Sequence, residues 1–196
     1  MRHLQTTKRL LLTAALAAVL PFGMAASASA AGTLTLSSPQ DPGSWDPIDT
    51  FLVNWSSVAT NVYEGLVYRT PDLKIVPALA TSWEVLDEGK RLRFKLRDGV
   101  TFHNGDPLTA EAVKWNWDRK SGQEGWLCAR FFNGQAGGLK VEAVEAPDPK
   151  TVVFRLAEPS GLFLTQLANI QCGMLVASPK SVGADGTWTP IGTGPF

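Results

Sequence analysis

Apolar and polar residues alternate most cleanly in two stretches, residues 91–97 and residues 151–156. Period-two alternation is typical of a strand that buries one face and exposes the other. The apolar members are Leu92, Phe94 and Leu96 in the first stretch and Val152, Phe154 and Leu156 in the second. A shorter strand is predicted over residues 33–37, where a turn cluster over residues 39–43 must end it.

Apolar residues spaced three or four positions apart predict three helices. The first covers residues 57–66, with Val58, Val62 and Leu66 on one stripe. The second begins after Thr109, a natural N-cap, and turns Val113 and Trp117 inward. The third follows Pro159-Ser160, and its apolar positions are Phe163, Leu167 and Ile170. Strands with alternating faces mixed with helices predict an α/β or α+β lobe.

The first thirty residues have the layout of an export signal. A basic start precedes an apolar run over residues 10–20, and small residues follow up to Ala28-Ser29-Ala30. This layout predicts a signal peptide over residues 1–30 with cleavage near Ala30, and the alternative is a retained N-terminal anchor. Because no cysteine stands at the cleavage point, we expect a soluble periplasmic or extracytoplasmic product rather than a lipid-anchored one.

Removal of the signal changes the charge balance. Three of the 18 Lys and Arg residues and none of the 18 Asp and Glu residues precede residue 31, so the remainder carries a net charge of −3. Such a chain lacks the basic surface that nucleic acid requires, and we expect no nucleic-acid partner. His103 becomes the only histidine, which excludes a His-pair metal site and leaves few parts for a Ser-His-Asp hydrolase. We therefore predict no catalytic residue, no metal and no cofactor.

The chain has two cysteines, Cys128 and Cys172. An even number of cysteines in an oxidising compartment favours a disulfide bond between them. The alternative is a pair of buried thiols, which pack like small apolar side chains.

Two glycine-containing segments indicate tight turns. Asn104-Gly105 tolerates positive φ and predicts a turn between a strand and a capped helix, which indicates a structural role for the neighbouring His103. Gly192-Thr193-Gly194 lacks the Lys-Ser/Thr ending of a phosphate-binding loop. We therefore favour a tight backbone turn there over a phosphate cradle.

Several segments, in the same order and spacing, resemble a known family. They are Asn-Val-Tyr-Glu-Gly-Leu-Val at 61–67, Pro-Ala-Leu-Ala-Thr-Ser-Trp-Glu at 77–84, Phe-Lys-Leu-Arg-Asp-Gly-Val-Thr-Phe-His-Asn-Gly at 94–105, Pro-Leu-Thr-Ala-Glu-Ala-Val at 107–113, Val-Val-Phe-Arg-Leu at 152–156 and Pro-Ile-Gly-Thr-Gly-Pro-Phe at 190–196. Together they resemble the extracytoplasmic peptide- and nickel-binding proteins, solute-binding family 5. The resemblance covers nearly all of the chain after the predicted signal.

The resemblance implies a two-lobed periplasmic-binding-protein-like fold of class II. Residues 31–196 would form the N-terminal part of lobe I, and we expect the second lobe and the closing segment of the first to lie beyond this sequence. The implied function is capture of peptides, or of a related small solute, by a monomer that delivers them to the permease of an ATP-binding cassette importer. Nickel chelates, sugars and opines are alternative solutes, and a secreted hydrolase is the less supported alternative function.

Two pairs of aromatic and charged residues are candidate solute contacts. Trp45 and Asp46 follow the first predicted strand, and ligands of open α/β sheets bind beyond the carboxyl ends of strands. Trp126 and Arg130 combine a ring that stacks with a cation that pairs with a carboxylate. For each aromatic ring the alternative is packing in the core.

Overall fold

The computed structural model describes residues 35, 37, 41, 43–48, 53–123, 125–135 and 139–196. All helices and strands given below belong to one compact unit, Ser38–Phe196. The predicted signal over residues 1–30 lies outside the described residues. The predicted strand over residues 33–37 also lies outside them except at Thr35 and Ser37, which are not assigned to a strand.

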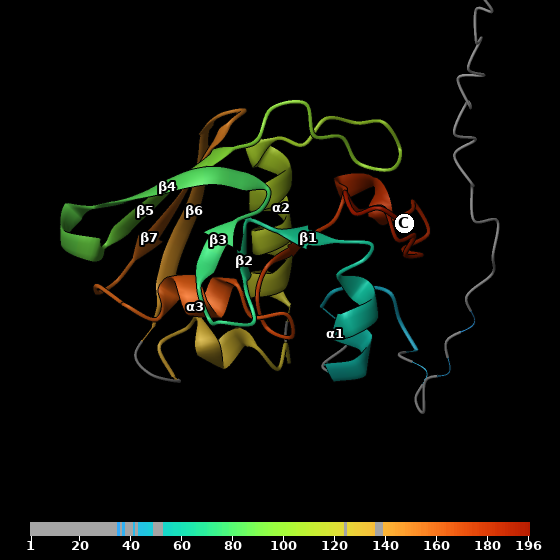
Figure 1. The fold of residues 1–196 in the computed structure, drawn as a ribbon, viewed down its shortest axis with the longest axis horizontal. Helices are drawn as coiled ribbons and strands as arrows, with labels where there is room; N and C mark the ends of the chain where they lie inside the picture. Colours follow the sequence, from blue (N-terminus) through green and yellow to red (C-terminus); the bar gives the residue numbers. More distant parts are fainter. Residues whose placement is uncertain are drawn as a thin grey trace, which may run out of the picture. The chain divides into compact units, whose positions relative to one another are not determined.

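A four-stranded antiparallel sheet in the order β4-β5-β7-β6 forms the largest element of the fold (Figure 1). Its strands are β4 (Ala80–Leu86), β5 (Arg91–Leu96), β6 (Val141–Asp148) and β7 (Thr151–Leu156). The two central strands, β5 and β7, are those predicted from alternation, and all six of their predicted apolar positions are buried. Val153 is buried as well, so β7 has buried apolar side chains on both of its faces.

One face of the sheet is covered by α2 (Ala110–Gly122). The predicted N-cap is confirmed, since the Ala112 N–H donates to Oγ1 of Thr109 at 3.3 Å. Trp117 points into the core, and its ring lies edge-on to Phe154 with centroids 5.6 Å apart. Val113, one turn earlier, is also fully buried, as its spacing predicted.

The third predicted helix is shorter than expected. The helix α3 (Phe163–Leu167) buries Phe163 and Leu167, but Ile170 lies beyond its end and is exposed. The cause is local, because Oδ1 of Asn169 accepts hydrogen bonds from the backbone N–H groups two and three residues later. Such a side-chain turn competes with the helix, so the prediction for Ile170 is wrong.

The first predicted helix, over residues 57–66, is wrong in both position and buried face. The helix in the structure is α1 (Val53–Ala59), and Val58 on the predicted stripe is exposed. The side-chain amide of Asn61 donates hydrogen bonds to the backbone carbonyls of Ser57 and Val58. These bonds pair carbonyl groups of the last helical turn that have no partner within the helix, so the helix ends there. The chain then continues into the short strand β1 (Glu64–Gly65).

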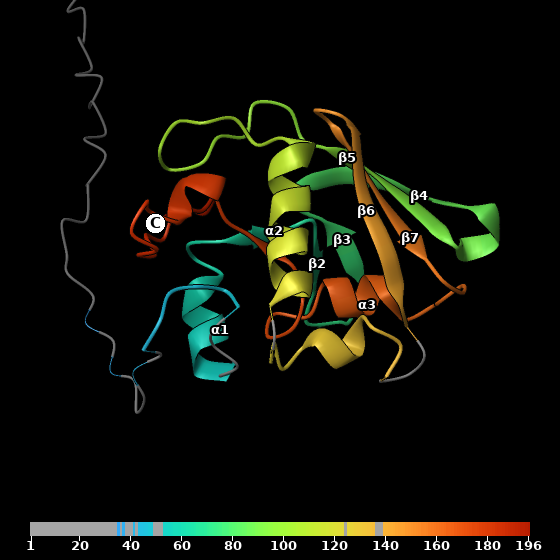
Figure 2. The ribbon, with the colours of Figure 1, turned by 180° about the vertical axis from the view of Figure 1, so that it is seen from behind.

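Two further pairs of strands complete the fold. β1 pairs with β8 (Leu175–Val176), and β2 (Val67–Arg69) forms a hairpin with β3 (Ile75–Pro77). Short 3-10 turns lie at Asp87–Gly89, Ala129–Phe131 and Pro179–Ser181. Figures 1 and 2 show α2 between the four-stranded sheet and the group formed by α1 and the C-terminal segment, so α2 has two packed faces. Among the described residues, no helix is both long and apolar enough to cross a bilayer.

Candidate functional site

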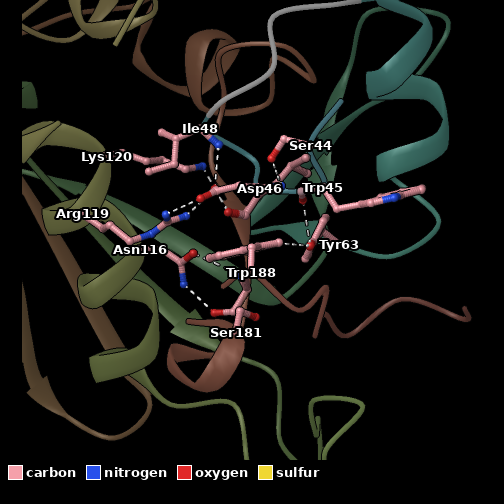
Figure 3. Close-up of polar contacts among 12 residues, drawn as sticks. Ser44, Trp45, Asp46, Ile48, Tyr63, Asn116, Arg119, Lys120, Ser181 and Trp188 are labelled. Carbon is pink, nitrogen blue, oxygen red and sulfur yellow. Dashed lines mark hydrogen bonds and ion pairs between the residues drawn. The ribbon is translucent and has the colours of Figure 1, made fainter. Parts of the chain in front are cut away.

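A largely buried ion pair joins α2 to residues 43–48, which we call the Trp45 loop (Figure 3). Both carboxylate oxygens of Asp46 accept hydrogen bonds from the guanidinium of Arg119, each at 2.6 Å. One of them also accepts the N–H of Ile48 at 3.0 Å. Asp46 is 7% exposed, so its charge is directed at groups inside the protein rather than at solvent.

Two tryptophan rings hold the guanidinium of Arg119. Its central carbon lies 4.5 Å from the ring centroid of Trp188 and 5.2 Å from that of Trp115. An arginine favours this arrangement because its planar cation binds a carboxylate with two parallel hydrogen bonds while stacking on aromatic faces. The pair with Asp46 is therefore fixed in orientation as well as in distance.

The backbone of the Trp45 loop is held by two further side chains. Oη of Tyr63 donates to the carbonyl of Trp45 at 3.0 Å and accepts a hydrogen bond from Nε1 of Trp188 at 3.1 Å. Nε1 of Trp55 donates to the carbonyl of Ser44 at 3.0 Å. Burial raises the pKa of Tyr63 to about 12, which keeps its hydroxyl protonated as a donor. The ring of Trp45 points away from this cluster and is 38% exposed (Figure 3).

The same side of α2 also holds the chain around β8. Nδ2 of Asn116 donates to the carbonyl of Ala177 at 2.7 Å, and its Oδ1 accepts the N–H of Ala177 at 3.1 Å. Nζ of Lys120 donates to the carbonyls of Leu175 at 3.1 Å and Gly173 at 3.4 Å. Asn116 and Lys120 thus form hydrogen bonds with buried backbone groups around β8, which would otherwise need partners on a neighbouring strand.

Lys120 is the most strongly perturbed cation in the cluster. It is 2% exposed, and burial lowers its pKa to about 7. The positive charge of Arg119 lowers the pKa further, and the negative charge of Asp46 opposes this shift. The charges in the cluster therefore influence one another through a poorly solvated interior.

A disulfide bond ties the segment after α2 to the segment after α3. It joins Cys128 to Cys172, whose Cα atoms lie 5.2 Å apart. The bond constrains residues 125–135, which carry the second pair of candidate solute contacts.

Trp126 and Arg130 border a pocket in this constrained segment. The pocket has a volume of about 330 Å³ and is lined by Gly125, Trp126, Leu127, Ala129, Arg130 and Gln135. The ring of Trp126 is largely buried and stacks on Phe132, with centroids 6.0 Å apart. The guanidinium of Arg130 is exposed and lies 5.2 Å from the ring centroid of Phe131. The pocket therefore combines an apolar floor with an accessible cation.

His103 and the Gly192-Thr193-Gly194 segment form a structural clasp. Nδ1 of His103 accepts the N–H of Gly192 at 3.2 Å, and Nε2 lies 2.8 Å from the carbonyl oxygen of Gly194, to which it donates. A Cβ atom at Gly192 would overlap the backbone of Val62, and one at Gly194 would overlap that of Asn61. The predicted structural role of His103 is confirmed. Residues 192–194 form a bend that packs against the backbone of Asn61 and Val62 rather than the predicted tight, hydrogen-bonded turn.

Comparison with known proteins decides the family. Residues 74–196 match the model of the family described as Bacterial extracellular solute-binding proteins, family 5 Middle. The chain belongs to this family. The resemblance predicted from the sequence motifs is thereby confirmed.

Curated relatives of this family 5 chain are named as binding proteins. The Glutathione-binding protein GsiB of Escherichia coli (strain K12) is 32% identical over 174 residues, which cover 88% of this chain and 33% of the relative. The Probable deoxycholate-binding periplasmic protein YgiS of Escherichia coli (strain K12) is 34% identical over 140 residues, covering 65% of this chain and 26% of the relative. The chain thus spans about a third of the length of the curated relatives it matches.

Solved structures of other binding proteins share the fold. NikA from Brucella suis, in complex with Fe(III)-EDTA, is 30% identical with a TM-score of 0.70, covering 81% of this chain and 31% of that one. The periplasmic binding protein DppA from Helicobacter pylori, in complex with the peptide STSA, is 26% identical with a TM-score of 0.64, covering 78% and 33%. The predicted mixed α/β fold of a periplasmic binding protein, present here in part, is confirmed.

Within this family 5 chain, the predicted site residues lie in two separate pairs. Trp45 and Asp46 share the Trp45 loop, while Trp126 and Arg130 share the disulfide-bonded segment, and among the described residues no hydrogen bond, ion pair or ring contact joins the two pairs. Sequence reasoning missed Arg119 because its partner lies 73 positions away. The only local signal was that Arg119 follows two tryptophans in α2, Trp115 and Trp117. A cation beside such residues on a helix by itself indicates a solvent-facing position.

Proposed function

We propose that the protein containing this chain captures a small solute outside the cytoplasm and delivers it to the permease of an ATP-binding cassette importer. The observation that carries this proposal is the family match over residues 74–196. The extracytoplasmic location is supported by the predicted signal over residues 1–30. Binding would bring two lobes together around the solute by a hinge motion, with no chemical change to the solute.

Peptides are the leading solute class in this proposal. One relative is named for glutathione, itself a small peptide, and one structural neighbour holds the peptide STSA. A peptide offers a terminal carboxylate, which suits the exposed guanidinium of Arg130, and apolar groups that suit the rings of Trp45 and Trp126. We propose that these three side chains form the contacts made by this lobe, with Asp46 supporting Trp45.

Other anionic solutes provide the strongest competing class. NikA from Brucella suis holds Fe(III)-EDTA, and another neighbour, AgaA, holds agropinic acid, so carboxylate-bearing solutes recur among the structural neighbours. The same guanidinium of Arg130 would pair with their carboxylates. The exposed guanidinium of Arg130 therefore favours a solute with at least one carboxylate over a neutral sugar.

Calorimetric titration of the full-length protein distinguishes these classes. The panel contains glutathione, the peptide STSA, Fe(III)-EDTA, agropinic acid and a neutral sugar. We expect saturable binding of one solute per protein for a peptide, weaker binding or none for the chelate and the opine, and none for the sugar. Tightest binding of a non-peptide would reassign the solute class, and binding of none would contradict the proposed function.

A further inference from the structure

We infer that Asp46 and Arg119 are positioning residues whose buried ion pair holds the Trp45 loop so that the ring of Trp45 stays presented to the solute. The inference rests on the proposed function, because it assigns Trp45 to solute binding. It gives Asp46 a part in binding that requires no contact between its carboxylate and the solute.

The hydrogen bonds of Asp46 argue against direct solute contact. Its two carboxylate oxygens accept two hydrogen bonds from Arg119 and one from the Ile48 N–H. A solute would have to displace a charge-assisted, bidentate contact from a site that is 7% exposed. The carboxylate is therefore committed to the loop that carries it.

The ion pair fixes geometry more than it stabilises the fold. Removing two charges from water offsets much of the attraction between them, so a buried pair contributes little net free energy of folding. Arg119 is nevertheless held by two tryptophan rings and a bidentate carboxylate, a combination that an ammonium group does not reproduce. Such precise placement is typical of residues that set the position of a neighbouring segment.

The backbone of the loop is anchored on either side of Trp45, whose ring remains exposed. Tyr63 binds the carbonyl of Trp45, and Trp55 binds that of the preceding residue, Ser44. On the following side, Asp46 is bound to Arg119. With its backbone fixed before and after the ring, Trp45 loses less conformational entropy when a solute orders it, which favours affinity.

A double-mutant cycle in solute affinity tests the inference in the full-length protein. Calorimetry with glutathione and with the peptide STSA is carried out on the wild type, Asp46→Asn, Trp45→Ala and the double variant. Asn keeps an oxygen that accepts the Ile48 N–H but loses the charge that holds Arg119. We expect Asp46→Asn to weaken binding about 3- to 10-fold in the wild type and less than about 2-fold in the Trp45→Ala background.

Direct contact between Asp46 and the solute makes a different prediction. In that case the loss from Asp46→Asn would persist at full size in the Trp45→Ala background, which would overturn the inference. Arg119→Lys keeps the charge but loses the planar fork, and we expect it to weaken binding as Asp46→Asn does. Lys114→Met removes an exposed ion pair with Asp118 on the same helix and is the matched control, with unchanged affinity expected.

Amide hydrogen exchange tests the positioning step without any solute. We expect exchange across residues 43–48 to be about 10-fold faster or more in Asp46→Asn and in Arg119→Lys, with no change in Lys114→Met. Unchanged exchange in the first two variants would show that the pair does not hold the loop. If the wild type binds no solute of the panel, the proposed function fails and the role in binding falls with it, while faster exchange would still show that the pair orders the loop.

Discussion

At the scale of single residues, the buried side of α2 carries one cation, Lys120, where a helix normally packs apolar groups. Lys120 donates hydrogen bonds to two backbone carbonyls there, but its charge loses its hydration. This loss of hydration is the largest cause of the shift in its pKa, which falls to about 7. Asp46 and Arg119 compensate each other, whereas the charge of Lys120 has no carboxylate partner among the described ion pairs. The stability of the fold should therefore depend on pH through this one amine.

Lys120→Met should remove a pH dependence that the wild type shows. Between pH 7 and pH 10.5 the unfolded chain binds the Lys120 proton and the folded chain does not, so the free energy of unfolding of the wild type rises with pH across this window. Below about pH 7 both states bind the proton and the dependence ends. Urea denaturation at a series of pH values measures this, with Lys114→Met as the exposed control. Parallel curves for the wild type and Lys120→Met would contradict the buried, perturbed amine.

Leu73 carries backbone strain at the tip of the β2-β3 hairpin. Its φ is 65°, in the left-handed region that favours glycine, and its side chain is 72% exposed and makes little packing contribution. Leu73→Gly should raise the free energy of unfolding by about 0.5 kcal/mol, the relief of strain minus the entropy that glycine adds to the unfolded chain. Leu73→Ala keeps the Cβ atom and should change little. Equal stability of the two variants in thermal denaturation would exclude strain as the cause.

At the scale of elements, the sequence predicted the central strands β5 and β7 and the start of α2, but not the outer strands β4 and β6 or the bounds of α1. β5, β7 and the start of α2 follow from alternation and from the Thr109 cap, because these signals lie within a few residues of one another. α1 and α3 were misjudged because the amide side chains of Asn61 and Asn169 end them by binding nearby backbone groups. An apolar stripe continues through such a residue, so periodicity alone overextends the helix.

The candidate site was only partly predictable for a related reason. Residue type and loop position indicated Trp45 and Arg130 as exposed aromatic and cationic groups, and the structure places both at the surface. The partner of Asp46 is set by how α2 packs against the Trp45 loop. That packing depends on contacts between residues far apart in the chain, and no local pattern encodes it.

The Cys128–Cys172 disulfide bond links the segment after α2 to the segment after α3. In the chain-entropy account, closing a loop with a sequence separation of 44 lowers the entropy of the unfolded chain and stabilises the fold by up to about 4 kcal/mol. A Cys128→Ser, Cys172→Ser double variant should lose stability up to that amount in urea denaturation. Intact-mass analysis under non-reducing conditions should show the wild type lighter by two hydrogens. Two alkylated thiols without prior reduction would contradict the bond.

At the scale of the whole molecule, this chain spans about a third of the length of the relative GsiB. The pocket at Trp126 and Arg130 and the ring of Trp45 are the surfaces of this chain that we propose to face a solute. Specificity in a two-lobed protein is shared between both walls of the cleft. Substitutions in this chain should therefore weaken binding without abolishing it.

Arg130→Ala in the full-length protein should weaken binding of a carboxylate-bearing peptide by about 1.5 to 3 kcal/mol, the range for a hydrogen bond to a charged group. Because the guanidinium is exposed, the melting temperature should not change. Calorimetry with the peptide STSA and with its C-terminal amide tests whether Arg130 binds the terminal carboxylate. Arg130→Ala should weaken binding of the free-acid peptide and leave binding of the amide unchanged. A lower melting temperature with normal affinity would assign Arg130 to the fold.

We propose that this family 5 protein binds its solute without altering it, and equilibrium dialysis followed by mass spectrometry tests both parts of that proposal. The full-length protein is dialysed against glutathione and against the peptide STSA, and the solute on each side is quantified and its mass determined. We expect enrichment on the protein side that saturates at one solute per protein, with the solute mass unchanged. The appearance of cleavage fragments over time would contradict it, as would absence of enrichment for these two peptides and for the chelate, the opine and the sugar of the titration panel.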